Sequence, residues 1–154
     1  MITPRQRTLA GEHTLEGVGV HSGETASLTM GPATSGGVRF RRVDLVGSPE
    51  IPADLDHVVA CEMGTSLGSG EVRVQTVEHV MAALYAGGVD HAVLALRGPA
   101  APTLDGSFQR YLDAISEMGA VELDEPAEVL AVRKVLTVSV DTGALYVASP
   151  AEDL

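Results

Sequence analysis

The spacing of apolar residues changes at position 76, and this change separates two kinds of predicted element. Before it, the runs ASLTM at 26–30 and VRFRR at 38–42 alternate or nearly alternate apolar and polar residues, which is typical of half-buried strands. Between them, the sequence GPATSGG is rich in the residues that form turns. The pattern therefore predicts a β-hairpin over 26–42.

A first amphipathic helix is predicted directly after Thr76, which can act as its N-cap. Its apolar residues recur at intervals of three and four, so they share one face of a helix: Val77, Val80, Met81 and Leu84. The sequence AGG at 86–88 favours its end. The apolar run at 91–98 then predicts a short buried strand.

A second amphipathic helix is predicted over 108–118. Its apolar face comprises Phe108, Tyr111, Leu112, Ile115 and Met118. Gly119 would end this helix, and either Asp105 or Ser107 would cap its beginning.

The chain after this helix is predicted to be organised separately. The segment 121–129 is acidic, contains one proline and is typical of a linker. Both 5–33 and 131–151 have a basic start, a β run, a polar turn with glycine, a second β run and a small-Pro-Ala ending. Any two hairpins can share such a composition by chance. If the similarity is a repeat, the chain comprises a domain at 1–120, a linker at 121–129 and the opening hairpin of a second, truncated domain at 130–154.

Composition narrows the classes of function. The net charge of −11 opposes binding to nucleic acid, and no apolar run approaches the roughly 18 residues of a membrane span. The arginines of RFRR at 39–42 could meet an anionic ligand, although a solvated strand is the commoner explanation. The single cysteine, Cys61, cannot form an internal disulfide, which fits the reducing cytoplasm.

The sequence QTVEHV at 75–80 contains the main chemical candidate, because it places Glu78 and His79 in the first turn of a predicted helix. A histidine there can offer a ring nitrogen to zinc, and an adjacent carboxylate can take a proton from water. The pair could equally be two polar residues on the outside of a helix, which is more common. Neither H-E-x-x-H nor H-x-x-E-H spacing is present.

Among the other candidates, His21 lies in the glycine-rich sequence GVGVHSGE, where the backbone could approach a ligand closely. A glycine-rich turn with a structural histidine is the alternative. Asp105 in LDGS is expected to cap a helix, with a supporting role at the active site as the alternative. The remaining histidines do not fall into any spacing typical of a metal or catalytic site: His13, His57 and His91.

Several stretches together resemble the first domain of the LpxC family, the bacterial UDP-3-O-acyl-N-acetylglucosamine deacetylases, which are zinc amidases of lipid A and lipopolysaccharide biosynthesis. In order, they are QRTL, GVGVHSGE, FRRVDL, IPAD, QTVEHVMAAL and PTLDGSFQRYLDAI. The resemblance implies two similar domains that face each other across the active site. For this chain it implies an α+β two-layer sandwich, a small β-sheet covered on one face by two helices, of the ribosomal protein S5 domain 2 type.

The resemblance also implies roles for individual residues. His79 falls on a zinc ligand and Glu78 on the general base, while His21 and Asp105 fall on elements near the site.

The stretch 60–67, which includes Met63 and Thr65, falls on the segment that lines the path of the substrate's sugar and acyl groups. Glu62, Met63 and Gly64 depart from the family's usual Cys and Thr pattern there.

The expected function is therefore that of the N-terminal part of a zinc-dependent deacetylase, which removes the N-acetyl group of UDP-3-O-acyl-N-acetylglucosamine in the cytoplasm. The family takes its other two zinc ligands from the second domain, so we expect an incomplete zinc site and little activity in this chain alone. A second-domain fragment or a second copy of the chain could complete the site. The alternative is a non-catalytic deacetylase-like module that binds a sugar nucleotide or dimerises.

Overall fold

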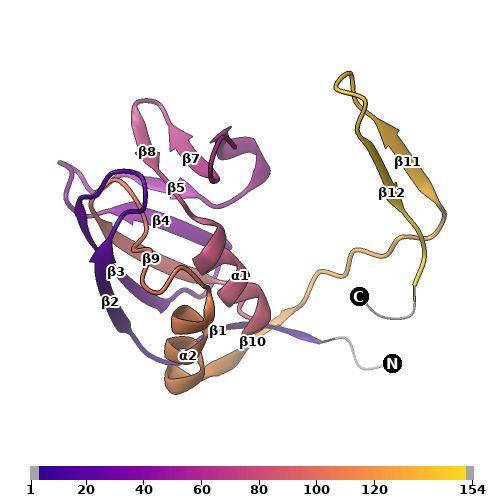
Figure 1. The fold of residues 1–154 in the computed structure, drawn as a ribbon. Helices are drawn as coiled ribbons and strands as arrows, with labels where there is room; N and C mark the ends of the chain where they lie inside the picture. The colour runs from indigo at the N-terminus through magenta and orange to yellow at the C-terminus, as the bar shows by residue number, and fades with distance from the viewer. Residues whose placement is uncertain (1–3, 152–154) are drawn as a thin grey trace.

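The structure is a computed structural model, and it describes residues 4–151. It is a mixed α+β fold with two helices, α1 (Glu78–Ala86) and α2 (Gln109–Met118), and several small sheets (Figure 1). The helices pack side by side and share a core with the largest sheet. The predicted class, an α+β fold with a small sheet and two helices, is confirmed. Neither helix is long and apolar enough to cross a membrane.

The largest sheet has five strands in the order β2-β3-β9-β4-β5. They are β2 (His13–Val18), β3 (Thr25–Pro32), β9 (Ala92–Arg97), β4 (Val38–Arg42) and β5 (Glu50–Pro52). The central strand β9 runs parallel to β4, and this pairing needs a crossover, which here includes α1. Leu94 and Leu96 of β9 are completely buried, and the buried strand predicted over 91–98 is confirmed.

The hairpin predicted over 26–42 is wrong, because β9 lies between β3 and β4. Neighbouring strands are about 4.8 Å apart, so the connection between these two strands must span two such spacings. Gly37 binds the inserted strand instead of closing a tight turn. Its N–H donates to Nδ1 of His91 at 2.8 Å, and its carbonyl accepts from the N–H of Ala92 at 3.3 Å.

Two smaller sheets flank the main one. A three-stranded sheet follows the short 3-10 helix η1 (Leu55–His57), and a two-stranded sheet joins the beginning of the chain to the segment after α2. Their strands are β6 (Val58–Ala60), β7 (Ser66–Ser69) and β8 (Val72–Val74) in the first, and β1 (Arg5–Leu9) and β10 (Ala120–Pro126) in the second. β8 leads directly towards α1, so this sheet determines where that helix begins.

Both predicted helical faces are turned towards the core. Leu84 of α1 and Tyr111 of α2 are almost completely buried, whereas Phe108, at the predicted beginning of the second helix, is 39% exposed. The hydroxyl of Tyr111 donates to the carbonyl of Pro102 at 2.6 Å, and burial raises the pKa of this hydroxyl. The predicted glycine ends are confirmed, since α1 ends before Gly87 and α2 ends before Gly119, whose φ is +74°.

The predicted N-caps are only partly right. Thr76 does not cap α1, because Val77 occupies the N-cap position and no side chain accepts a hydrogen bond there. At α2 the N-cap position is Phe108, whose own side chain makes no capping bond, and Oγ of Ser107 directly before it accepts from the N–H of Gln109 at 3.1 Å. Asp105 in turn accepts two hydrogen bonds from Ser107, each 3.0 Å long, so it fixes Ser107, and among the described residues it forms no hydrogen bond with α2 itself.

The segment after α2 also differs from the prediction. Most of the expected linker 121–129 belongs to β10, which pairs antiparallel with β1. Beyond it, β11 (Leu136–Ser139) and β12 (Leu145–Ala148) form an antiparallel hairpin that stands apart from the sheets and helices (Figure 1). Every residue from 128 to 151 is exposed, and 152–154 lie outside the described residues. The division into domains stays a prediction.

An ion pair between Arg42 and Asp44 joins the main sheet to β8. Nε and Nη2 of Arg42 lie 2.9 and 2.8 Å from the two carboxylate oxygens of Asp44. Nη1 of Arg42 donates to the carbonyl of Arg73 in β8 at 2.6 Å, and the N–H of Gly98 donates to Asp44 at 3.1 Å. The pair therefore fixes the strand that precedes α1.

This ion pair predicts how stability depends on pH. Hydrogen bonds from Arg42 lower the pKa of Asp44 from 3.8 to about 2. Because the pKa is lower in the folded chain, the pair stabilises the fold above pH 3.8, and this contribution is lost as the pH falls towards 2. Asp44→Asn is expected to lower the free energy of unfolding at pH 7 by about 1 kcal/mol, since the carboxylate is partly exposed to water.

Urea unfolding at several pH values measures this effect. Asp141→Asn, which changes an exposed carboxylate in the β11–β12 turn, is the control. The same pH dependence of stability in both variants and the unchanged chain would contradict the prediction.

Candidate functional site

Glu78 is the first residue of α1, and its carboxylate points towards the chain before β7. Its Oε2 accepts a hydrogen bond from the backbone N–H of Thr65 at 2.9 Å. A Cβ added at Gly64 would lie 3.1 Å from Oε1, so glycine leaves room beside this oxygen. Oε1 has no hydrogen-bond partner among residues 4–151. A half-buried carboxylate that is fixed through one oxygen, with the other available, can accept a proton from a neighbouring molecule.

Backbone hydrogen bonds fix the chain that leads into Glu78. The N–H of Gln75 donates to the carbonyl of Pro99, and the N–H of Ala101 donates to the carbonyl of Gln75, both at 3.0 Å. The N–H of Val77 donates to the carbonyl of Thr65 at 3.2 Å. Thr65 is therefore bonded both to the backbone before Glu78 and to the carboxylate of Glu78.

His79 follows in the same helical turn and is also half-buried. In the first turn of a helix, backbone N–H groups lack partners and the helix dipole is positive, which favours negatively charged groups nearby. Neither ring nitrogen of His79 has a hydrogen-bond partner among the described residues. Within residues 4–151, no three side chains of His, Cys, Asp or Glu come close enough together to hold a metal ion.

The glycine-rich loop at 17–23 lies against the segment that contains Thr65. Nε2 of His21 is 2.6 Å from the carbonyl oxygen of Met63, and because a carbonyl only accepts, Nε2 must carry the proton. Gly19 allows this loop to pack closely, since a Cβ there would lie 2.9 Å from the Cβ of Ala100. The structure thus brings His21, Met63 and Thr65 to the side of α1 that carries Glu78.

Two cavities adjoin this group of residues. One, of about 250 Å³, borders Glu78 and is mainly apolar: it is lined by Ala53, Asp54, Leu55, Val58, Thr65, Leu67, Val77, Glu78 and Met81. The other, of about 180 Å³, is more polar and is lined by His21, Glu62, Met63, Gly64, Ser66, Gln75 and Thr76. The first can take an apolar group and the second a polar one.

Within residues 4–151, the hydrogen bonds of Asp105 do not connect it to Glu78, His79 or His21. It accepts hydrogen bonds from Ser107, and these lower the pKa of its carboxyl. It lines neither of the two cavities, and among the described residues no hydrogen bond joins it to Glu78, His79 or His21.

Ser66 lines the polar cavity and lies in the stretch 60–67, which the resemblance places along the path of the substrate. Gln75 and Thr76 complete this cavity, and the sequence did not single them out as substrate-contacting residues. Their residue types carry no chemical signal, because neutral polar side chains are common in strands and turns. Only the position of Gln75 and Thr76 directly before Glu78 could have indicated a role.

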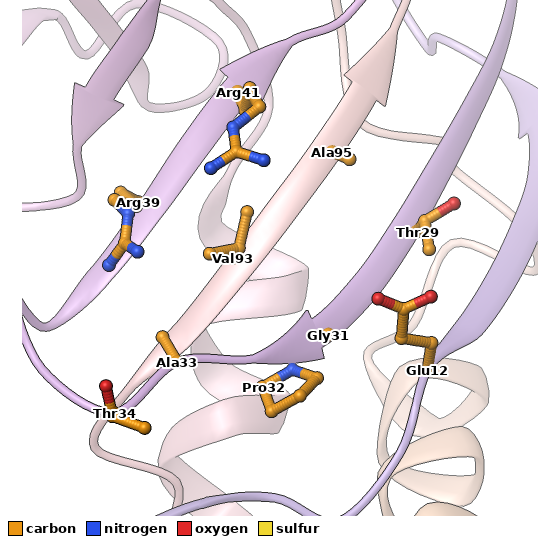
Figure 2. A pocket seen from close by; sticks show the side chains of 10 residues that line it. All are labelled: Glu12, Thr29, Gly31, Pro32, Ala33, Thr34, Arg39, Arg41, Val93 and Ala95. Atoms are coloured by element: carbon orange, nitrogen blue, oxygen red, sulfur yellow. The ribbon is translucent and has the colours of Figure 1, made fainter.

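The arginines of RFRR lie elsewhere. Figure 2 shows Arg39 and Arg41 on the same side of β4, with Glu12 across the sheet from them. These three residues line a cavity of about 450 Å³. Both arginines form ion pairs with Glu50, and Arg42 is paired with Asp44. Because Arg39 and Arg41 share the one carboxylate of Glu50, the three arginines and their two carboxylate partners together keep one positive charge. Whether an anion binds there stays a prediction.

Comparison with known proteins identifies related sequences. The family model for LpxC, UDP-3-O-acyl N-acetylglycosamine deacetylase, matches residues 6–154. The chain is 44% identical over 128 residues to the bifunctional enzyme LpxC/FabZ of Chlorobaculum tepidum, a match that covers 82% of this chain and 27% of that protein.

Two further relatives are called UDP-3-O-acyl-N-acetylglucosamine deacetylase. The protein of Thermosynechococcus vestitus is 37% identical over 155 residues, covering the whole of this chain and 54% of the relative. That of Myxococcus xanthus is 43% identical over 134 residues, covering 86% of this chain and 43% of the relative. The chain spans about half, or less, of the length of these curated relatives.

Proposed function

The chain belongs to the LpxC family of UDP-3-O-acyl N-acetylglycosamine deacetylases, and from this membership we propose that it supplies the general base and one zinc ligand of such a deacetylase. Glu78 would be the base and His79 the ligand. The observation that carries the proposal is the fixed carboxylate of Glu78, bonded to Thr65 through Oε2 and bordering a cavity through which a substrate group could approach.

The proposed role of Glu78 follows from its contacts. The hydrogen bond from Thr65 orients the carboxylate before substrate arrives, so no reorganisation is needed when a proton is transferred. Oε1 would take the proton from an attacking water molecule and later pass it to the nitrogen of the departing amine. Acetate and a free amino sugar would be the products.

This chain offers one suitable donor for a zinc ion. When bound, zinc would polarise the amide carbonyl and make water more acidic. The ring of His79 is the donor that this chain offers. A catalytic zinc site usually has three protein ligands and one open position, so we propose that the other ligands come from outside the described residues, in a second domain, a second-domain fragment or a second copy of the chain.

The substrate proposed for the complete site is UDP-3-O-acyl-N-acetylglucosamine, used in the cytoplasm for lipid A biosynthesis. The apolar cavity beside Glu78 is compatible with an acyl group, and the polar cavity at His21 with a hydroxyl-bearing sugar. We further propose that 1–120 form the first domain and that the hairpin β11–β12 opens a second one, which is supported by the greater length of the relatives.

A chimera tests the proposed function. Residues 1–154 would replace the matching part of the Thermosynechococcus vestitus relative, which this chain matches over its whole length. We expect this chimera to release acetate from UDP-3-O-acyl-N-acetylglucosamine, and a zinc chelator to abolish the release. The natural relative, assayed in parallel, is the control.

A chimera that folds and binds the substrate but releases no acetate, while the natural relative does, would contradict the proposal. That result would favour the alternative, a deacetylase-like module that binds a sugar nucleotide without hydrolysing it. Calorimetric titration with the sugar nucleotide and thermal unfolding establish binding and folding independently of activity.

A further inference from the structure

Thr76 combines two features that oppose stability, and it lies two residues before Glu78. Its backbone has a φ of +58°, a left-handed conformation that β-branched residues rarely adopt. The residue is only 4% exposed, and its hydroxyl has no hydrogen-bond partner among residues 4–151. Strained and unsatisfied groups persist mainly where the surrounding structure imposes them, and they are concentrated at functional sites.

The neighbouring residues impose this conformation from both sides. Before Thr76, the N–H and the carbonyl of Gln75 are both bonded to the loop at 99–101. After it, the N–H of Val77 is bonded to the carbonyl of Thr65. Because both neighbours are fixed, the change of direction from β8 into α1 falls on Thr76.

This change of direction sets the orientation of Glu78. The same Thr65 that accepts from Val77 donates its own N–H to the carboxylate of Glu78 at 2.9 Å. These two bonds close a ring through Val77 and Glu78, and Thr76 lies directly before it, between this ring and Gln75, which is bonded to the loop at 99–101. If the backbone at 76 could relax, Val77 and Glu78 would no longer be held rigidly relative to that loop, and the bond between the carboxylate and Thr65 would open more often.

We propose that Thr76 is a positioning residue, whose strained backbone holds the carboxylate of Glu78 against Thr65 at a cost in stability. The proposal rests on the proposed function only for the role of Glu78 as a base. The proposal predicts two opposite effects of a substitution that relieves the strain at 76: the fold becomes more stable, and the carboxylate of Glu78 becomes less firmly held. If Thr76 served only to pack the core, a substitution would raise or lower the stability of the fold and the order of Glu78 together.

The test compares Thr76→Gly with Thr76→Ala in the 154-residue chain. Both variants lose the hydroxyl and the methyl group, but only alanine keeps a Cβ in the left-handed conformation. At most positions alanine is the more stabilising of the two. At a φ of +58° we expect the reverse, with the midpoint of thermal unfolding about 4 °C higher in the glycine variant.

Hydrogen exchange measured by NMR reports the position of Glu78. The amide of Thr65 is expected to exchange about tenfold faster in the glycine variant than in the alanine variant, because its bond to the carboxylate opens more often. The amide of Leu94, in the central strand β9, is the control and should exchange more slowly in the glycine variant, following global stability.

Three results would overturn the proposal. An alanine variant that melts at or above the glycine variant would show that the position is not strained, and a glycine variant that fails to fold would show the same. A Thr65 amide that gains protection together with Leu94 would show that the strain does not hold Glu78. These measurements involve neither substrate nor zinc, so their failure and an inactive chimera are distinguishable.

Discussion

Glu78→Gln is expected to lower the rate of acetate release by the chimera about a thousandfold, within the range that removal of a general base usually costs. Glutamine cannot take a proton from water at neutral pH. It has nearly the same shape, and its amide oxygen can still accept the hydrogen bond from Thr65 that the carboxylate now accepts. The substitution therefore separates proton transfer from the structure of the helix start, and steady-state kinetics of the chimera measure the loss.

The controls for this variant use the same contacts. We expect the Michaelis constant and the thermal midpoint to change little, since the bond to Thr65 can remain. Glu117→Gln changes an exposed carboxylate on α2 and should leave the rate unchanged. A Glu78→Gln chimera that is folded and retains more than about one tenth of the rate would show that another group acts as the base.

The helices could be predicted from the sequence, whereas the order of the strands could not. Spacings of three and four residues identified the buried faces of α1 and α2, and Gly119 identified the end of α2, because helical bonds and the left-handed conformation of glycine are local. The pairing of β9 between β3 and β4 depends on residues far apart along the chain. The turn at 33–37 has the composition of a hairpin turn in either arrangement, so no local pattern could reveal the insertion.

The candidate site shows the same division between local and distant contacts. The sequence around Glu78 predicted that this residue lies on the first turn of α1. The cap predicted at Thr76 was wrong, because Val77 occupies the N-cap position. The bond between Thr65 and Glu78 could not be predicted, since it depends on how β7 and β8 turn the chain back towards the helix. The strain at Thr76 was equally hidden, because a threonine before a helix normally indicates a cap with extended backbone.

Phe40→Ala is expected to lower the free energy of unfolding by about 4 kcal/mol, in the range for deleting a fully buried aromatic side chain. Phe40 is completely buried at the middle of β4, where its neighbours across the sheet are Leu94 of β9 and Ile51 of β5. Phe40→Ala leaves a space inside the sheet. Leu94 and Ile51 cannot move to fill this space unless the backbone hydrogen bonds that join β4 to β9 and β5 break. Urea unfolding measures the loss.

The chain contains only one other phenylalanine, and it provides a matched control. Phe108 is 39% exposed before α2, so Phe108→Ala removes the same atoms from a position that is partly in water, and we expect a loss of about 1 kcal/mol. Phe40→Leu, which keeps most of the volume, should cost about 1.5 kcal/mol. Because domains of this size are stable by only about 5–15 kcal/mol, a loss of about 4 kcal/mol is roughly a quarter or more of the total. Equal losses at the two phenylalanines would contradict the central place of β4 in the core.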